Sequence, residues 1–302
     1  MEKVASEMSS AVAVVMCTFM GQTYLSQQLD SLLNQSRVPD RIYIYDDGST
    51  DNTPRIIADY CCKYPDIICP LADGKHRGIN GAVWYSLCQT REPMVFICDQ
   101  DDIWHEDKIR RMTELAQQQP QWESLPCIVH GEAMLFQDGQ ETGKLLSQLI
   151  GRRVRQPGVE DLLTHNSVQG CTMLINRPLI RLFCRKRLDD QFPHCIYDQW
   201  MGLIAAQFGR IWFIKEPLVY YRIHGKNVVG SMQVNLYEKY GLSRNRKIGC
   251  DFLESFRELM PPEAVARMQF WIAKGFRKMR LKELPKLTAK GVMALCFGIK
   301  NL

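Results

Sequence analysis

The sequence has few of the features that mark membrane-spanning or secreted proteins. No stretch approaches the run of about 20 apolar residues that a spanning helix requires, and the first apolar run covers only Ala11 to Cys17. A secretory leader is also missing, which predicts a reducing cytoplasm in which cysteines stay free thiols. We therefore expect a cytoplasmic protein that is soluble or peripheral at the inner face of the cytoplasmic membrane.

The cysteines and charges also lack a distinctive pattern. The 12 cysteines are scattered, with no CxxC pair and no His/Cys spacing typical of zinc. The net charge of +5 is too small to indicate a nucleic acid partner, and none is expected. With 46% hydrophobic and 24% charged residues, the composition is that of an ordinary globular enzyme.

The first half of the chain alternates strand and helix patterns. Apolar runs predict strands at 11–17, 41–45, 67–69 and 94–98. Helical spacing predicts helices between or after them, near 25–33, 53–62, 80–88 and 106–118. This order predicts an α/β fold with a mostly parallel, Rossmann-like central sheet flanked by helices. Ligands bind beyond the carboxyl ends of the strands in such sheets.

Beyond residue 120 the pattern is less regular. Strands are predicted at 127–130, 171–175, 210–214 and 218–222, and a helix at 198–206. Strand patterns largely vanish after residue 230. We predict a catalytic domain over 1–230, with a donor half at about 11–120 and an acceptor half at about 121–230. A helical, basic C-terminal extension would follow over 231–302.

Acidic residues directly follow two of the predicted strands. Asp99-Gln100-Asp101-Asp102 comes after the strand at 94–98, and Asp46-Asp47 closes the run at 42–45. Solvated turn aspartates would explain one cluster but are a poor explanation for both, because buried strands have little structural use for unpaired acids at their ends. The pattern favours a site that holds a divalent cation or grips a polar ligand.

Five blocks in sequence order resemble glycosyltransferase family 2, and together they cover roughly residues 11 to 230. The second is similar to the DxD segment of that family, in the form common among bacterial rhamnosyltransferase-like members. The blocks are Val14–Phe19 with the helix to Gln35 and Asp46–Asp51, then Asp99–Trp104, Asn166–Asn176, Tyr197–Trp200 and Tyr220–Asn227. Met20 and the turn at Lys75–Gly78 depart from the family pattern. Both lie in loops expected near the donor, so they bear on donor identity more than on the fold.

The resemblance implies an A-type glycosyltransferase fold and an inverting, metal-dependent transferase. Such an enzyme would move L-rhamnose from dTDP-rhamnose to a glycan or lipid-linked glycan acceptor in bacterial surface polysaccharide biosynthesis, such as that of O antigen. A UDP-hexose-dependent transferase of the same family is the main alternative. An Asp-x-Asp phosphatase is less favoured, since its motif normally follows the first strand. A non-catalytic nucleotide-sugar-binding module is disfavoured by the intact metal motif.

A divalent metal that bridges the phosphates of a nucleotide sugar would stabilise the departing diphosphate. Oxygen ligands favour Mn²⁺ or Mg²⁺. We assign Asp101 to the metal and place Asp99 near the ribose and the metal. Asp102 is either a ligand or an organiser of the site, and a helix cap before Ile103 is its alternative role. His224 would complete the metal shell.

The resemblance also implies a donor pocket at the strand ends. Backbone near Cys17 would meet the pyrimidine ring, Phe19 would pack against it, and Asp47 would accept a hydrogen bond from the ring N–H. Gln100 belongs to the same donor-binding segment, and Arg222 would reach the leaving diphosphate. A simple core aromatic is the alternative interpretation of Phe19.

Transfer with inversion needs one general base to take the proton from the acceptor hydroxyl. Asp198 is the candidate, because it opens a predicted helix beside Tyr197 and Trp200, whose aromatic surfaces suit a sugar ring. The alternative role of Asp198 is that of a helix cap.

The tail at 267–302 holds nine Lys or Arg residues against one acid, Glu283. Aromatic residues such as Phe270 and Trp271 interleave with the basic ones, as in an amphipathic helix that lies on an anionic membrane surface. The alternative is a basic helix that packs its aromatic face on the catalytic domain.

Overall fold

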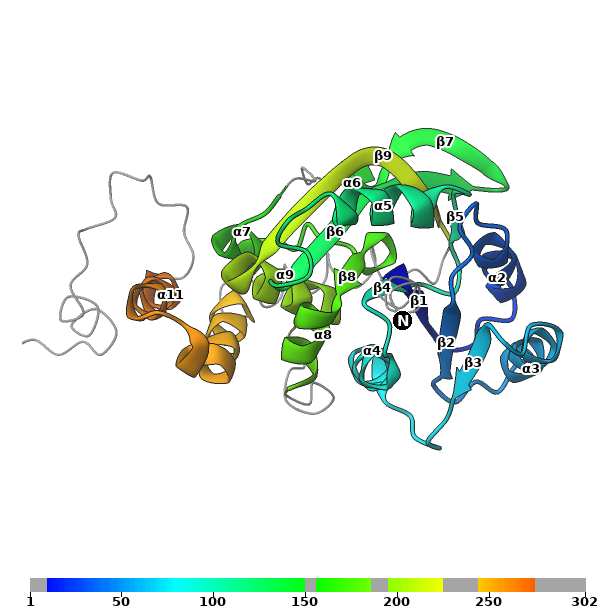
Figure 1. Cartoon of the computed structure of the whole chain (residues 1–302), viewed down its shortest axis with the longest axis horizontal. Helices are drawn as coiled ribbons and strands as arrows, with labels where there is room; N and C mark the ends of the chain where they lie inside the picture. Colours follow the sequence, from blue (N-terminus) through cyan, green and yellow to red (C-terminus); the bar gives the residue numbers. More distant parts are fainter. Residues whose placement is uncertain (1–9, 150–155, 186–194, 225–243, 275–302) are drawn as a thin grey trace, which may run out of the picture.

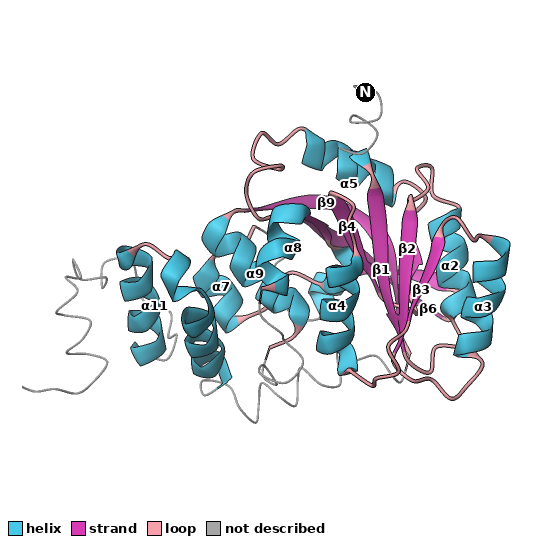
Figure 2. Ribbon diagram, turned by 60° about the horizontal axis from the view of Figure 1, so that its bottom comes forward, coloured by secondary structure: helices cyan, strands magenta, loops and turns pink. Residues whose placement is uncertain are grey.

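The computed structural model describes residues 10–149, 156–185, 195–224 and 244–274. Within these ranges a mixed sheet of nine strands forms the centre of the molecule (Figure 1), and helices cover both of its faces (Figure 2). The strand order is β3-β2-β1-β4-β8-β6-β9-β5, and β7 pairs with β6 outside this path. The predicted α/β fold with a flanked central sheet is confirmed.

The N-terminal half of the sheet is parallel, as its alternating pattern predicted. In spatial order its strands are β3 (Ile68–Leu71), β2 (Arg41–Asp46), β1 (Val12–Thr18) and β4 (Met94–Cys98). The connecting helices are α2 (Leu25–Leu33), α3 (Thr53–Lys63) and α4 (Gly78–Gln89). Because both faces of this half are covered, residues 12–16 of β1 form an unbroken apolar run with 0% exposure.

The C-terminal half is joined mainly by antiparallel pairs. Its strands are β8 (Leu174–Asn176), β6 (Cys127–Gln137), β7 (Gln140–Leu145), β9 (Arg210–Arg222) and β5 (Ile103–Trp104). β8 runs antiparallel to both β4 and β6, and β5 runs antiparallel to β9, whereas β6 and β9 are parallel. The short β5 therefore brings the segment after β4 against the end of β9.

Two predictions for this half need correction. The strand predicted at 171–175 begins only at Leu174, because Gly170–Thr172 forms a 3₁₀ turn, η1. The strands predicted at 210–214 and 218–222 are one strand, β9, whose pairing with β6 shifts register near Pro217. Proline has no backbone N–H for the ladder, so a local shift in register lets the strand continue past it.

The remaining helices are α5 (Lys108–Gln117), α6 (Leu146–Leu149), α7 (Val159–Thr164), α8 (Arg177–Cys184), α9 (Tyr197–Phe208) and α11 (Pro262–Lys274), together with helical residues 244–256. They pack on the sheet or, at the C-terminal end of the described chain, on α9 (Figure 1). Successive residues of β1 face opposite clusters: Ala13 and Val15 join the cluster of α4, α8 and α9, whereas Val14 and Met16 join that of α2 and α5.

The C-terminal residues 244–274 pack on α9. The ring of Phe252 lies 5.3 Å from that of Trp200, and Met268 of α11 belongs to the same apolar cluster. Phe270, one of the aromatics expected at a membrane surface, is only 2% exposed. Residues 275–302 of the basic tail lie outside the described part of the chain. None of the helices within the described ranges is long and apolar enough to cross a membrane.

Candidate functional site

The carboxyl ends of β1, β2 and β4 meet at one edge of the sheet, and the end of β9 reaches the same place. Their parallel pairing puts Phe19, Asp47 and Asp99 just beyond neighbouring strands. Through its pairing with β5, β9 delivers Arg222 and His224 beside the acidic segment 99–102. The structure thus brings together residues that lie more than a hundred positions apart in the sequence.

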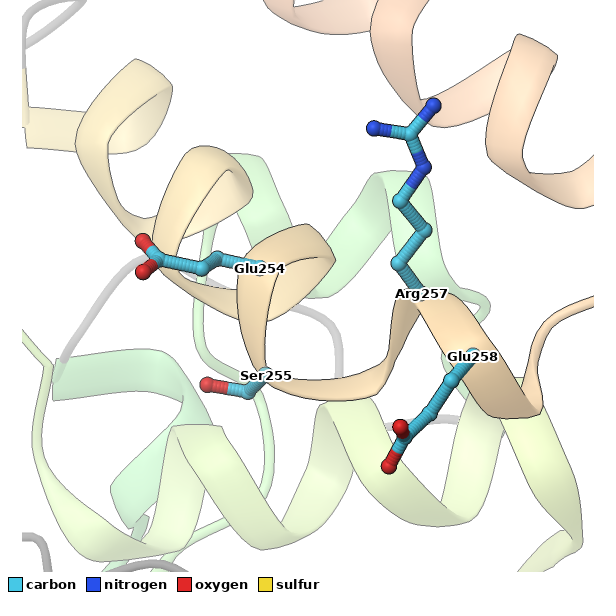
Figure 3. Close-up of a pocket in the computed structure, with 4 residues that line it drawn as sticks. All are labelled: Glu254, Ser255, Arg257 and Glu258. Atoms are coloured by element: carbon cyan, nitrogen blue, oxygen red, sulfur yellow. The ribbon is translucent and has the colours of Figure 1, made fainter.

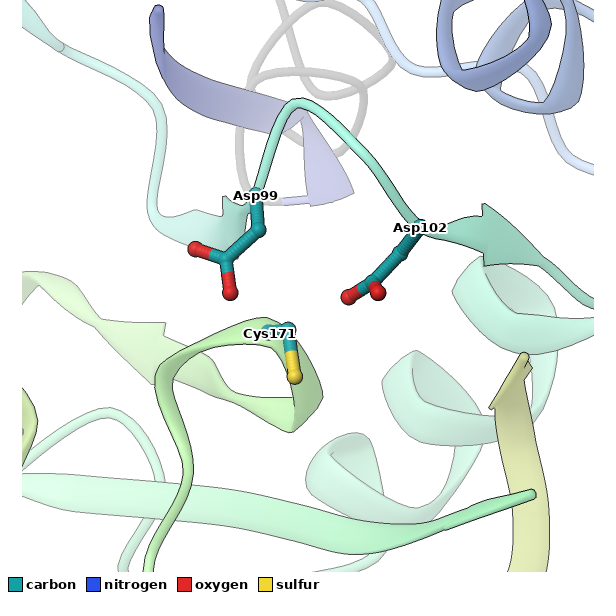
Figure 4. Close-up of side chains that lie close together, drawn as sticks. All are labelled: Asp99, Asp102 and Cys171. Carbon is teal, nitrogen blue, oxygen red and sulfur yellow. The ribbon is translucent and has the colours of Figure 1, made fainter. Parts of the chain in front are cut away.

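The centre of this edge is an acidic cluster. Carboxylate oxygens of Asp99 and Asp102 and the thiol sulfur of Cys171 lie within 4.8 Å of one another, and the three side chains converge (Figure 4). Asp102 is 0% exposed, and its Oδ1 accepts the backbone N–H of Arg222 at 3.2 Å. Its Oδ2 is buried without a hydrogen-bond partner. A buried acceptor left unpaired beside other acids suits a cation, so these residues fit a divalent metal.

Electrostatics in the cluster lead to the same conclusion. Burial, together with the charges of Asp101 and Asp198, raises the pKa of the Asp99 carboxyl to about 7. Burial also raises the pKa of Asp102 well above its ordinary value, with Asp101 and Asp99 adding to the effect. Ionising both acids would therefore concentrate more negative charge here than the chain's own cations offset, and a bound cation would relieve this excess.

Asp101 and His224 meet beside the cluster. The imidazole Nε2 of His224 lies 2.8 Å from Oδ2 of Asp101, and its ring lies 5.2 Å from that of Tyr24. The side chain of His224 is 16% exposed and that of Asp101 is 23% exposed. A carboxylate and an imidazole held this close offer two ligand atoms to one metal.

Arg222 lies against the segment that carries the acids. Its Nε donates to the carbonyl of Asp101 at 2.9 Å, and its Nη2 donates to Oε1 of Gln27 at 2.7 Å. The guanidinium also stacks 4.5 Å from the ring of Tyr24. With Arg222 only 9% exposed, these contacts fix the backbone at Asp101 against β9.

Gln100 ties the acidic segment to β1. Its amide accepts the Phe19 N–H at 2.9 Å and donates to the Phe19 carbonyl at 3.0 Å. A Cβ at Gly21 would lie 2.2 Å from Oε1 of Gln100, so only glycine at 21 leaves this pairing in place. The Phe19 side chain is 50% exposed, and its interpretation as a core aromatic is therefore wrong.

The acids that end β2 have different environments. Asp46 accepts the Thr18 hydroxyl at 2.8 Å and the Ser49 N–H at 2.9 Å, so it shapes the turn. Asp47 accepts the backbone N–H groups of Arg77 and Gly78, at 2.5 and 2.9 Å, at the start of α4. The sequence did not separate the two roles.

The loop before α4, where the sequence departs from the family pattern, lies against the same edge. The imidazole Nδ1 of His76 donates to the Asp47 carbonyl at 2.7 Å, and the His76 ring lies 5.5 Å from that of Phe19. Nearby, burial raises the pKa of the half-buried Cys17 thiol to about 12. Cys17 is therefore a neutral thiol at ordinary pH.

Asp198 is the second residue of α9 and is 9% exposed. The N-cap of α9 is Ile196 and makes no side-chain capping bond, so Asp198 is not the cap of this helix. Its Oδ1 accepts the Gln199 N–H at 2.6 Å. Its charge contributes to the raised pKa of Asp99, so the two carboxylates lie near enough to interact.

Three residues near the site were not expected from the sequence. Lys108 is 0% exposed, and its ammonium donates to the Cys171 carbonyl at 2.6 Å and lies 3.4 Å from the centre of the Trp104 ring. Burial lowers the pKa of Lys108 to about 8. Cys171 and Asn80 also join the site through contacts that are distant in sequence. A lysine at the start of a helix looks like a surface residue, and no local pattern distinguishes this one.

A hollow lies in the C-terminal helices, away from this edge. It has a volume of about 430 Å³ and is lined by Glu254, Ser255, Arg257 and Glu258 (Figure 3). Glu258 pairs with Arg185 at 3.1 Å. These mostly exposed charges do not converge on a common point, so the acidic edge is the better candidate site.

The chain is similar to known glycosyltransferases in sequence and in fold. A family model described as glycosyl transferase family 2 matches residues 13–183. The dTDP-rhamnosyl transferase RfbG of Shigella flexneri is 28% identical over 246 residues, which cover 76% of this chain and 80% of that protein.

Two solved structures share the fold. Residues 1–349 of S. aureus TarS, in complex with UDP, give a TM-score of 0.57 at 14% identity, covering 90% of this chain and 76% of that one. The mannosyltransferase PcManGT from Pyrobaculum calidifontis, in complex with GDP-Man and Mn²⁺, gives 0.53 at 16% identity, covering 88% and 71%. These likenesses confirm the A-type glycosyltransferase fold.

Proposed function

Because the chain belongs to glycosyl transferase family 2, we propose that it transfers a sugar, with inversion and metal dependence, from a nucleotide-diphosphate donor to a glycan acceptor. The observation that carries this proposal is the meeting of Asp101 and His224 at 2.8 Å beside the buried acids Asp99 and Asp102. Nothing else in the described ranges gathers as many potential metal ligands at the carboxyl ends of parallel strands, where α/β proteins bind their ligands.

Asp101 and His224 would hold Mn²⁺ or Mg²⁺ together with Asp99 and the unpaired oxygen of Asp102. The other oxygen of Asp102 would orient the segment through its bond to the Arg222 N–H. The metal, when bound, would stabilise the charge that develops on the departing diphosphate. Arg222 supports the donor site by fixing the backbone of Asp101. Arg222 reaches the diphosphate itself only if its bond to Gln27 is exchanged for one to a phosphate oxygen.

The donor base would lie over Phe19, whose half-exposed ring is held in place by Gln100 through both backbone groups. Each oxygen of the Asp47 carboxylate already accepts one backbone N–H. A carboxylate oxygen has capacity for a second bond, so Asp47 can also accept the ring N–H of uracil or thymine. Adenine lacks this ring N–H, so uracil or thymine is favoured over adenine. Backbone at Cys17 would line the same pocket.

Asp198 is the proposed general base. Its carboxylate would take the proton from the acceptor hydroxyl while that oxygen attacks the anomeric carbon and the bond to the diphosphate breaks. No second carboxylate is needed as a nucleophile in such a direct displacement. The charge influence between Asp198 and Asp99 indicates that the base and the donor segment border one reaction space.

L-Rhamnose from dTDP-rhamnose is the proposed donor sugar, supported by the likeness to the Shigella flexneri dTDP-rhamnosyl transferase over most of both chains. A glycan or lipid-linked glycan of bacterial surface polysaccharide is the proposed acceptor. A UDP-hexose donor is the alternative. The departures at Met20 and at 75–78 surround the proposed base pocket, where they would affect that choice.

Calorimetric titration with dTDP and UDP, with and without Mn²⁺, tests the proposal. Tight binding is expected only with Mn²⁺, and Asp101→Ala should weaken it at least about a hundredfold, because a metal ligand is lost. The exposed acid Asp59 of α3 provides the matched control, and Asp59→Ala should bind as the parent chain does.

The preferred nucleotide would then decide between the rhamnose and hexose donors. No binding of either nucleotide under any metal condition would reject the proposal. Release of nucleoside diphosphate only in the presence of an acceptor would separate a transferase from a phosphatase or a binding module.

A further inference from the structure

Asn80, in the first turn of α4, makes two bonds to the start of α9. Its Nδ2 donates to the carbonyl of Cys195 at 2.8 Å, and its Oδ1 accepts the backbone N–H of Tyr197 at 2.9 Å. A primary amide that gives one bond and receives one along the same backbone stretch fixes both the position and the direction of that stretch. These bonds join residues 115 and 117 positions apart.

The start of α9 needs such a partner. Tyr197 is its first residue, and the N–H groups of a first turn have no acceptor within their own helix. The N-cap Ile196 has no side-chain oxygen and makes no capping bond. Asn80 therefore supplies, from another helix, the capping acceptor that the local sequence lacks.

The start of α4, which carries Asn80, is held in place by Asp47. The carboxylate of Asp47 accepts the N–H groups of Arg77 and Gly78 just before Asn80. A carboxylate at a helix N-terminus also interacts favourably with the helix dipole. Gly78 has φ of 63°, a left-handed conformation in which glycine is unstrained. The first turn of α4 is thus anchored to the end of β2.

The stretch that Asn80 holds leads directly to Asp198. Tyr197 is 4% exposed and packs against η1, where a Cβ on Gly170 would lie 1.9 Å from the Tyr197 hydroxyl. The ring therefore positions one side of the α9 start, and the amide of Asn80 positions its backbone. Between them they leave Asp198 little freedom to move relative to β2 and the acidic segment.

We propose that Asn80 is a positioning residue that sets the Asp198 carboxylate against the donor site by capping α9 from α4. The inference rests on the proposed function, in which Asp198 is the general base. It gives α4 two roles, because its start is anchored by Asp47 beside the donor base and its first turn aligns the helix that carries Asp198. Donor pocket and proton acceptor then share one rigid support.

Hydrogen–deuterium exchange tests the structural part without any substrate. In Asn80→Ala the Tyr197 amide loses its acceptor, so its exchange should speed up at least tenfold. Gln89→Ala, at an exposed amide near the far end of the same helix, is the matched control and should leave Tyr197 unchanged. Asn80→Asp keeps the acceptor for Tyr197 and should preserve its protection, which gives a second variant if Asn80→Ala folds poorly. Unchanged exchange at Tyr197 in Asn80→Ala would overturn the inference.

Turnover tests whether the positioning matters. With dTDP-L-rhamnose, and with water or octyl glycosides as acceptors, Asn80→Ala should release dTDP ten- to a hundredfold more slowly, as expected when a reacting group is misplaced by about 1 Å. Its affinity for dTDP with Mn²⁺ should stay within twofold. On an Asp198→Asn background the same substitution should change the rate by less than twofold, because Asn80 acts through Asp198.

Different results would reject the positioning role of Asn80 and the proposed function. A full additional loss on the Asp198→Asn background would show that Asn80 does not act through the base. Full activity of Asp198→Asn itself would instead reject the base assignment of the proposed function. If the parent chain binds neither dTDP nor UDP, the proposed function fails, and the exchange of the Tyr197 amide still decides whether Asn80 caps α9.

Discussion

The two halves of the sheet use different kinds of pairing. Residues 11–120 supply the parallel strands β1, β2, β3 and β4, each linked along the chain to the next by a helix. Residues 121–224 supply β6, β7, β8 and β9, whose pairings are antiparallel except for that of β6 with β9. The first half is built from repeated local units, whereas the second half depends on segments that are distant in sequence.

The difference shows how the site is divided. The parallel half brings Phe19, Asp47 and Asp99 to one edge through strand register alone. The other half adds His224 and Asp198 through long-range contacts, with Asp101 on one side and Asn80 on the other. We therefore expect the parallel half to govern donor binding and α9 of the second half to govern the rate.

Among the substitutions that test this comparison, the largest effect on the reaction rate is expected at Asp198. Asp198→Asn removes the proton acceptor and should lower dTDP release from dTDP-L-rhamnose about a thousandfold. Its affinity for dTDP with Mn²⁺ should stay within about threefold, because Asp198 is not among the residues proposed to hold the nucleotide or the metal. Timed assays of dTDP release measure the rate, and calorimetry measures the affinity for dTDP.

Asp138→Asn, at an exposed turn between β6 and β7, is the control for the loss of an acid from the same half. Asp138 has φ of 51°, which asparagine tolerates, so rate and affinity should both be retained. A loss of nucleotide binding in Asp198→Asn would contradict the division of labour between the halves.

A smaller effect is expected from pH, through Asp99. Its pKa is raised by burial from 3.8 to about 7 in the folded chain, so folding favours the protonated acid. The stabilisation that this provides is complete below the unfolded value and is lost as the pH rises through about 7. Without metal, Tm should fall as the pH rises from about 4 to about 7, because the ionised carboxylate is destabilised by burial.

Mn²⁺ should reverse that fall above about pH 7, since it binds the ionised acids that burial destabilises. Asp99→Asn cannot ionise at this position, so its Tm should vary less with pH. Thermal unfolding in EDTA and in Mn²⁺ gives both results. A profile that is the same in the parent chain and in Asp99→Asn would show that Asp99 is not the group responsible.

The smallest effect is expected at Phe19. Phe19→Ala should weaken dTDP binding about tenfold through lost stacking. The free energy of unfolding should change by less than about 0.5 kcal/mol, because the side chain is half exposed. Val38→Ala, at a site 44% exposed, is the control and should change neither quantity. A large loss of stability in Phe19→Ala would mean that the ring supports the fold rather than the ligand.

Much of the parallel half could be predicted from local pattern. The strand predicted at 94–98 has those bounds in the structure, and the helix predicted near 53–62 ends one residue later. Buried parallel strands are continuous apolar runs, which are easy to recognise. The strand predicted at 171–175 failed because the residues of η1 are as buried as those of the strand that follows, and a run of buried residues does not separate a short strand from a buried turn.

The candidate site divides along the same line. The acids that follow the strands at 41–45 and 94–98 could be predicted, because a carboxylate directly after an apolar run is easy to recognise in the sequence. Lys108, Cys171 and Asn80 could not, because each joins the site through a partner that is distant in sequence. Lys108 is 0% exposed in the folded chain, but no periodicity in the sequence distinguishes it from a lysine on the surface.

The sequence by itself determined the α/β class, the strand ends that carry acids and the family, since these depend on short segments whose side chains encode burial or charge. Only the tertiary structure decided which acid meets His224, which of Asp46 and Asp47 faces α4, and what holds the start of α9. These outcomes depend on register and on polar bonds between distant segments, which form only once the chain is folded.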